Sequence, residues 1–220
     1  MPPRATPSER QKRLGAELRK MRLAAQVSTE YAAGLLGIDR AKISNIEAGV
    51  RVISPEPPGL LQTDAYARTL FAAALPPLSR AEVELRVALR LQRQQVLHRE
   101  DPIGYVGYVH EAALRVEFGG AKVMRAQLDQ LCELSESENI DVRVIPFRAG
   151  AFPGAGQAVI YAEGPVPQLN TVELDSAHGP EFLHGQSQLD KYRSHLDWME
   201  SASLSPADSR DFMHRIAGEL

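Results

Sequence analysis

A run of prolines divides the sequence into two unequal parts. Three of the four residues 55–58 are proline. Proline lacks a backbone N–H, fixes φ and disfavours helical backbone in the residue before it, so this stretch is predicted to be extended rather than helical. We therefore expect one module over 8–52, a proline-rich junction over 53–58 and a second module over 59–220.

The two parts carry opposite net charges. The 220 residues contain 25 Lys and Arg against 28 Asp and Glu, which gives a net charge of −3. Up to Val52 there are ten basic and five acidic residues, a net of +5, so the remainder carries −8. This asymmetry predicts a basic module that faces a polyanion, joined to an acidic body, although a solvated helix face is an alternative.

Cysteine content and hydropathy predict a cytoplasmic location. The single cysteine, Cys132, excludes an internal disulfide and a zinc site made of several cysteines, which fits a reducing compartment. No run approaches the ~20 apolar residues of a membrane span, and residues 1–6 lack the apolar core of an export signal.

The basic module has the pattern of three short helices. Apolar residues recur at helical spacing between residues 8 and 26, which predicts the first helix. The residues of this stripe are Leu14, Leu18, Met21 and Ala25. Ser28 can cap a second helix that ends at Gly37, and Asp39 can cap a third helix over 40–48. Two short helices joined by a tight turn that contains glycine form a helix-turn-helix unit.

Three strings of this module resemble the Xre/Cro-type DNA-binding domain. They are Leu14-Gly15-x-x-Leu18-Arg19, Val27-Ser28-x-Glu30-x-x-Ala33-x-x-Leu36-Gly37-Ile38 and Ile43-Ser44-x-Ile46-Glu47-x-Gly49. The resemblance implies a transcriptional regulator that binds double-stranded DNA as a homodimer, with its third helix in the major groove. Its DNA-binding residues would be Thr29, Arg40, Ala41, Lys42, Ser44 and Asn45.

The family register also implies a role for individual residues. In this register Arg40, Ala41 and Asn45 would contact base edges, and Lys42 would lie close to a phosphate. Thr29 occupies a position where the family usually has Gln, so it offers the DNA backbone a shorter donor. Family members continue with further helices, and three helices bury little apolar area, so we expect this module to be truncated.

The acidic body is predicted to be α+β, with helices packed on a small sheet, and the whole chain is therefore mainly α. Helices are predicted over 64–75, 80–98, 121–138 and 185–201, and from Ser205 onwards. Strands are predicted over 105–109, 141–146, 157–161 and 171–174.

Four strings of the body resemble a domain of unknown function that follows Xre-type modules in many bacterial regulators. They are Pro58-Gly59-Leu60-Leu61-Gln62-Thr63-x-x-Tyr66-Ala67-Arg68, Glu111-Ala112-Ala113-Leu114-Arg115, Val144-Ile145-Pro146-Phe147 and Ser203-Leu204-Ser205-Pro206-x-x-Ser209. The resemblance covers residues 58–220 and implies no enzymatic activity. It also implies a small acidic partner protein, which is often encoded beside such regulators.

One glycine-rich segment of the body, residues 147–156, is a candidate for recognition. Loops on a rigid scaffold often carry binding residues, and this one holds two aromatic residues beside strands expected to bear charged residues. The candidate residues for a ligand or partner are Glu111, Arg115, Arg143, Phe147 and Phe152. The segment could line a pocket for a small signal or receive the tail of a partner protein, and a plain loop between strands is an equal alternative.

Other polar groups of the body do not form a recognisable catalytic or metal-binding motif. The six histidines include no HExxH motif and no i, i+4 pair, so neither a metal nor a cofactor is expected. A set around His178 is predicted to lie in one solvated loop; its members are Asp175, Ser176, His178 and Glu181. Five arginines of the long helix could touch DNA, but interspersed acidic residues favour a solvated face. These are Arg80, Arg86, Arg90, Arg93 and Arg99.

The sequence thus favours a DNA-binding regulator, not an enzyme, whose acidic body dimerises and senses a ligand or a partner. Two alternatives belong to other classes. One is an antitoxin-like or adaptor module that binds a small partner protein and regulates its own synthesis. The other is an enzyme that acts on a small metabolite, against which the absence of a compact catalytic motif counts.

Overall fold

The sheet at the centre of the chain combines parallel and antiparallel pairing. The computed structural model describes residues 49–54, 57–150, 158–164, 166–176 and 179–220, so the three helices expected within residues 1–48 lie outside it. Six strands pair in the order β3-β2-β1-β4-β5-β6. They are β1 (Gly49–Ser54), β2 (Tyr105–His110), β3 (Ile140–Ile145), β4 (Val159–Glu163), β5 (Thr171–Ser176) and β6 (Gly179–Leu183). The pairs β1–β2 and β2–β3 are parallel, and the other three are antiparallel.

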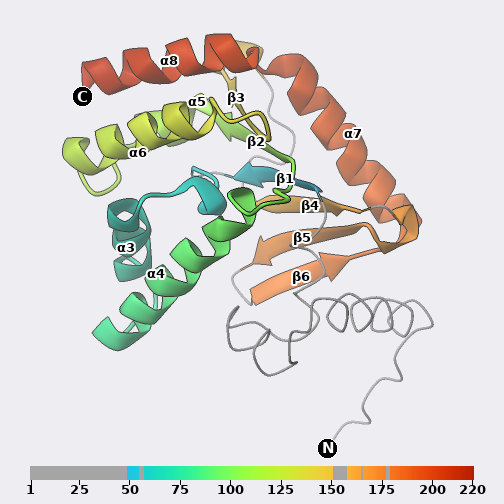
Figure 1. Cartoon of the computed structure of the whole chain (residues 1–220), viewed down its shortest axis with the longest axis horizontal. Helices are drawn as coiled ribbons and strands as arrows, with labels where there is room; N and C mark the ends of the chain where they lie inside the picture. The colour runs from blue at the N-terminus through green and yellow to red at the C-terminus, as the bar shows by residue number, and fades with distance from the viewer. Residues whose placement is uncertain (1–48, 55–56, 151–157, 165, 177–178) are drawn as a thin grey trace, which may run out of the picture.

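Helices contain more of the described residues than strands do (Figure 1). The α-helices are α3 (Asp64–Ala72), α4 (Arg80–Gln94), α5 (Glu111–Arg115), α6 (Ala121–Leu134), α7 (Gln186–Ala202) and α8 (Pro206–Glu219). Short 3-10 turns are η2 (Gly59–Leu61), η3 (Gln95–Leu97), η4 (Phe147–Ala149) and η5 (Pro167–Leu169). The α+β character of the body is confirmed, although the sheet is larger than predicted, since β1 and β6 were not predicted.

Helix starts agree with the predicted caps. The Thr63 and Ser205 side chains accept hydrogen bonds from backbone N–H groups in the first turns of α3 and α8. Ser79 and Glu82 form the predicted capping box of α4. Helix ends agree less well: α3 ends at residue 72 and α6 at residue 134, because periodicity alone does not mark where the last turn stops.

Residues 49–54 form an inner strand where the sequence suggested the end of one module and the start of a link. In β1, Val52 lies opposite Gly107 of β2 and Ile160 of β4. Three of its six residues are Val or Ile, which favour strands. The strand ends before Pro55, as it must, because proline cannot donate a hydrogen bond to a neighbouring strand.

The second half of the proline run packs against the sheet and is not a solvated link. Pro57 and Pro58 are both buried. A Cβ atom on Gly107 would lie 3.2 Å from Cγ of Pro58, so the glycine in β2 leaves room for this proline. The Pro57 carbonyl accepts a hydrogen bond from Nε2 of Gln62 at 2.6 Å.

Glutamine side chains bind the backbone of residues 61–63, which follow the prolines. Oε1 of Gln127, a residue of α6, accepts from the Thr63 N–H at 2.8 Å, and its Nε2 donates to the Leu61 carbonyl at 2.9 Å. Gln94 donates to the Gln62 carbonyl at 2.6 Å, and Arg90 donates to the Gln62 side chain. Because Gln62 and Gln127 are fully buried, these bonds satisfy backbone groups that water cannot reach.

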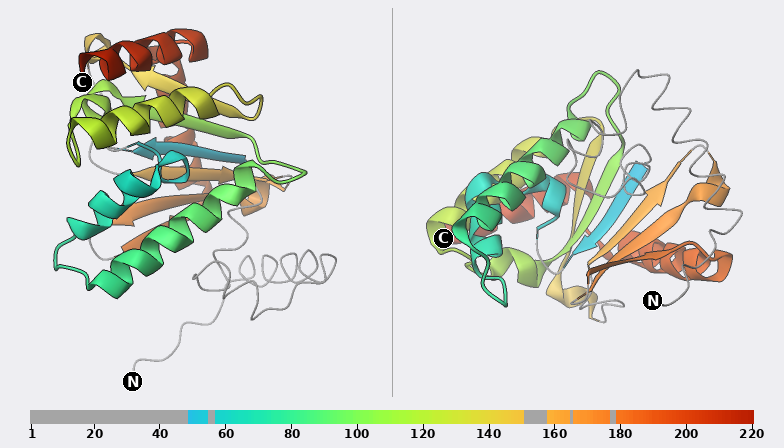
Figure 2. Two further views of the ribbon diagram at one scale, coloured as in Figure 1. Left: turned by 60° about the vertical axis from the view of Figure 1, so that its left-hand side comes forward. Right: turned by 90° about the horizontal axis from the view of Figure 1, so that it is seen from below.

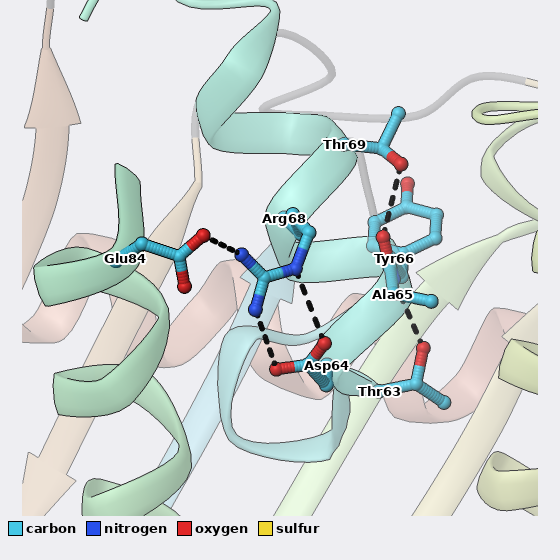
Figure 3. Close-up of polar contacts among 7 residues, drawn as sticks. All are labelled: Thr63, Asp64, Ala65, Tyr66, Arg68, Thr69 and Glu84. Carbon is cyan, nitrogen blue, oxygen red and sulfur yellow. Dashed lines mark hydrogen bonds and ion pairs between the residues drawn. The ribbon is translucent and has the colours of Figure 1, made fainter. Parts of the chain in front are cut away.

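Surface ion pairs join α3 to α4. Arg68 pairs with Asp64 one turn earlier at 3.2 Å and with Glu84 of α4 at 2.5 Å (Figure 3). All three side chains are substantially exposed, so these pairs orient the two helices and contribute little to stability.

The two faces of the sheet bury separate cores. Along β2, Tyr105 and Val109 belong to a core with α6 and α8, whereas Tyr108 belongs to a second core with α7. Figure 2 shows α7 on one side of the sheet and α3, α4 and α6 on the other. Alternate strand residues point to opposite faces, so both sets of helices find apolar partners.

The prediction of a solvated loop over residues 175–181 is wrong for its described part. β5 and β6 form an antiparallel hairpin in which Asp175 lies opposite Pro180 and Leu174 opposite Glu181. These residues pair because β5 offers a hydrogen-bonding edge, which the composition of the segment does not reveal. His178 lies outside the described residues.

Candidate functional site

The predicted DNA-binding residues lie outside the described part of the chain, and so does Phe152. The former are Thr29, Arg40, Ala41, Lys42, Ser44 and Asn45. The site that the structure does describe belongs to the acidic body.

A cavity of about 520 Å³ opens beyond the carboxyl ends of β2 and β3. Its lining comes from the start of α5, from η4 with the preceding proline, and from α8 with the residue before its cap. The lining residues are Glu111, Pro146, Phe147, Arg148, Leu204, Asp208, Asp211, Phe212 and Arg215. We call this cavity the α8 groove. The carboxyl ends of parallel strands are the usual place for ligands in open α/β sheets.

Glu111 braces one wall of the groove. It begins α5, not a strand as expected, because the strand ends at His110, whose side chain caps the helix. Only 7% of Glu111 is exposed. Its Oε2 accepts from the Phe147 N–H at 2.9 Å and its Oε1 from Nε of Arg115 at 2.7 Å. Both carboxylate oxygens therefore hold η4 and α5 in place.

The same bonds keep Glu111 ionised. Burial raises the pKa of its carboxyl, but the hydrogen bonds from Phe147 and Arg115 outweigh burial, so the pKa lies below its ordinary value.

Arg115 links α5 to the end of the chain. It too lies on α5 rather than on a strand, and Nη1 pairs with Glu219 of α8 at 2.8 Å. Arg115 is not among the residues that line the α8 groove, so its position indicates a bracing role for the wall.

Arg143 does not join the groove. It lies on β3, as expected, and Nη2 pairs with Asp141 at 3.4 Å. Its Nε atom is buried and has no hydrogen-bond partner among the described residues. Of the four described candidate residues, Glu111 and Phe147 therefore line the groove, and Arg115 and Arg143 do not.

Two phenylalanines contribute to the apolar part of the groove. The Phe147 side chain, 54% exposed, meets the His110 ring edge-on with 5.3 Å between ring centroids. Phe212 of α8 is half-buried, and the Arg215 guanidinium lies 5.4 Å from its ring centroid. An exposed phenylalanine beside a cavity is a surface that a ligand can cover.

The groove also presents charged groups that have no hydrogen-bond or ion-pair partner among the described residues. Among the described residues, the side chains of Arg148, Asp211 and Arg215 form no hydrogen bond and no ion pair. Asp208 accepts from the Ser205 hydroxyl at 2.6 Å.

Sequence reasoning missed the α8 side of the groove. Asp208, Asp211, Phe212 and Arg215 follow the i, i+3, i+4, i+7 spacing of one helix face, and this spacing was the available signal. The spacing could not show that this face of α8 lines a cavity together with η4, which lies about sixty residues earlier in the sequence.

Cys132 and Arg90 have structural roles in the described part of the chain. Cys132 is buried, and its thiol lies 3.8 Å from the Arg210 carbonyl. Burial, with a smaller effect of Asp129, raises the pKa of the thiol to about 11. Arg90 is bound to Gln62 and lies over the Phe71 ring at 4.5 Å, which leaves it a structural role in place of a DNA contact.

The described residues include neither a metal-binding cluster nor a membrane-spanning helix. Within these residues, no group of three or more His, Cys, Asp or Glu side chains is arranged to hold a metal ion. None of the described helices is long and apolar enough to cross a membrane.

Comparison with known families identifies both modules. A family described as a domain of unknown function, DUF5753, matches residues 50–215, and a family described as a helix-turn-helix domain matches residues 13–70. The two matches overlap over residues 50–70, the stretch that contains most of β1 and all of η2. No curated protein and no solved structure matches the chain.

Proposed function

The chain belongs to the DUF5753 family, and because a helix-turn-helix domain precedes that domain, we propose that it is a sequence-specific DNA-binding transcriptional regulator. The helix-turn-helix match over residues 13–70 is the observation that carries this proposal. The protein acts in the cytoplasm as an Xre-type regulator and is not an enzyme.

Operator reading is assigned to the third helix of the basic module. An α-helix fits the major groove, where arginine recognises guanine and asparagine recognises adenine by paired hydrogen bonds. Arg40, Ala41 and Asn45 face base edges, and Lys42 and Thr29 contact the DNA backbone. We assign Ser44 to the same set of DNA-binding residues.

The C-terminal domain supplies the dimer surface and the sensor. One recognition helix reads only a few base pairs, so two half-sites about one turn apart are needed for useful specificity. The α8 groove is the sensing site, which the cavity, its exposed Phe147 and its unpaired charges support.

The test is a salt-controlled affinity measurement on an operator selected from random duplexes. Arg40→Ala and Asn45→Ala should each weaken operator binding about tenfold or more, since each removes a paired contact to a base. Arg86→Ala, on the exposed face of α4, is the matched control and should leave affinity unchanged. Unchanged affinity in both base-reading variants contradicts the proposed mechanism.

Dimerisation has its own measurement. Sedimentation of the full chain at micromolar concentration should show a dimer with and without operator. A monomer under both conditions contradicts the dimer.

A further inference from the structure

We propose that the α8 groove binds a small zwitterionic molecule with an apolar body, the chemistry of a dipeptide that carries apolar side chains. This inference rests on the proposed sensing function and adds the class of ligand. It follows from the size, the apolar surface and the charges of the groove.

The size of the groove suits a small molecule. Ligand pockets in proteins usually measure roughly 300–1,000 Å³, and the groove measures about 520 Å³. A protein surface would need a flatter and larger patch, of about 800 Å² on each partner. A cavity bounded by one face of α8 and by η4 therefore favours a small ligand over a globular partner.

The apolar part of the lining suits an apolar body in the ligand. Phe147, Phe212, Pro146 and Leu204 contribute side chains with no charge to the lining. Phe147 is 54% exposed although it is part of this lining. Covering such a ring removes apolar surface from water, which favours binding.

The exposed charges of the groove match a ligand that carries both signs. Arg148 and Arg215 present guanidinium groups, and Asp211 presents a carboxylate, and none of these is paired among the described residues. A ligand that carries both signs can pair with the guanidinium groups and with the carboxylate at the same time. A carboxylate can receive paired hydrogen bonds from an arginine, and an ammonium group can donate to Asp211 or Asp208.

Glu111 already has a structural role in the wall of the groove. Both of its carboxylate oxygens already accept hydrogen bonds, from Phe147 and Arg115. It is therefore a positioning residue for η4, and the ligand-binding variants do not change it.

The experiment is calorimetric titration of the full chain with L-phenylalanyl-L-leucine. The free dipeptide should bind, and its N-acetyl and C-amide forms, each of which lacks one charge, should bind at least tenfold more weakly. Three variants should each lower the affinity for the free dipeptide about tenfold: Arg148→Gln, Arg215→Gln and Asp211→Asn. Arg125→Gln and Asp129→Asn, exposed on α6 and outside the groove, are matched controls and should bind as the wild type does.

Three results would overturn the inference: no binding of the dipeptide at millimolar concentration, equal binding of the capped forms, or equal loss in the control variants. Circular dichroism of each variant checks folding, and three separate groove variants keep the test decisive if one fails to fold. Operator affinity measured without dipeptide tests the proposed function separately. Intact operator binding with no dipeptide binding rejects this inference alone, whereas dipeptide binding without operator binding rejects the regulator.

Discussion

The hydroxyl oxygen of Ser209 accepts a hydrogen bond from the backbone N–H of Val144 at 2.9 Å, so α8 covers the outer edge of β3. The neighbouring Val144 carbonyl accepts from the Leu204 N–H, also at 2.9 Å. An unpaired edge strand invites pairing with another chain, and here the segment 204–209 occupies that edge. The same segment carries Leu204 and Asp208 into the α8 groove.

Ser209→Ala should destabilise the protein by about 1–3 kcal/mol, because it leaves the buried Val144 N–H without a partner. The free energy of unfolding in urea measures this. Ser187→Ala, an exposed position of α7, is the control and should change stability by less than about 0.5 kcal/mol. Equal stability of the two variants would show that the edge contact is not needed.

Gln127→Leu should lower the free energy of unfolding by about 2–4 kcal/mol. The substitution removes the hydrogen-bond partners of the Thr63 N–H and the Leu61 carbonyl in a buried region. Gln130 also donates to that carbonyl at 3.1 Å, which limits the loss. Urea unfolding is again the measurement, with Gln95→Leu at an exposed position as the control. If Gln127→Leu lowers the free energy of unfolding no more than the control does, the two hydrogen bonds of Gln127 do not stabilise the protein.

Glu111→Gln should destabilise by about 1–3 kcal/mol at neutral pH through loss of the charged pair with Arg115. Since folding lowers the pKa of Glu111, the carboxylate contributes stability above its unfolded pKa and loses it as the pH falls through the lower folded value. The difference in unfolding free energy between wild type and variant should therefore shrink below about pH 4.3, the ordinary glutamate pKa. Glu117→Gln, exposed and outside this network, should show no such trend, and a pH-independent difference for Glu111→Gln would argue against the ion pair.

Cys132 should resist alkylation by iodoacetamide at pH 8 in the folded protein. Its pKa of about 11 keeps the thiol protonated, and only the thiolate reacts. Because it is the single cysteine of the chain, mass spectrometry of the intact protein reports this site alone. Labelling should become at least tenfold faster in denaturant, and equal rates would mean that the thiol is accessible.

Local signals in the sequence predicted local structure well. The capping box of Ser79 and Glu82, the Thr63 cap and the start of α8 after Ser205 are all present, because each depends on residues within one helical turn. The helix-turn-helix match confirms the type of the basic module for the same reason, since its turn and spacing lie within about forty residues. The roles of Arg40 and Asn45 within it stay predictions.

Non-local structure was predicted less well. Residues 49–54 precede prolines and lie between two modules, so their place inside the sheet depends on partners more than fifty residues away, in β2 and β4. The short α5 was missed because five residues carry no periodicity, and its stability comes from the contacts of Glu111 and Arg115.

The sequence by itself determined the resemblance to the two families, most helix starts, four of the six strands and two residues of the groove, Glu111 and Phe147. Only the tertiary structure decided that β1 is an inner strand, that Ser209 covers an edge, and that Asp211, Phe212 and Arg215 face η4. The physical reason is that capping and periodicity act between near neighbours, whereas strand pairing and a ligand groove need contacts between residues that are distant along the chain.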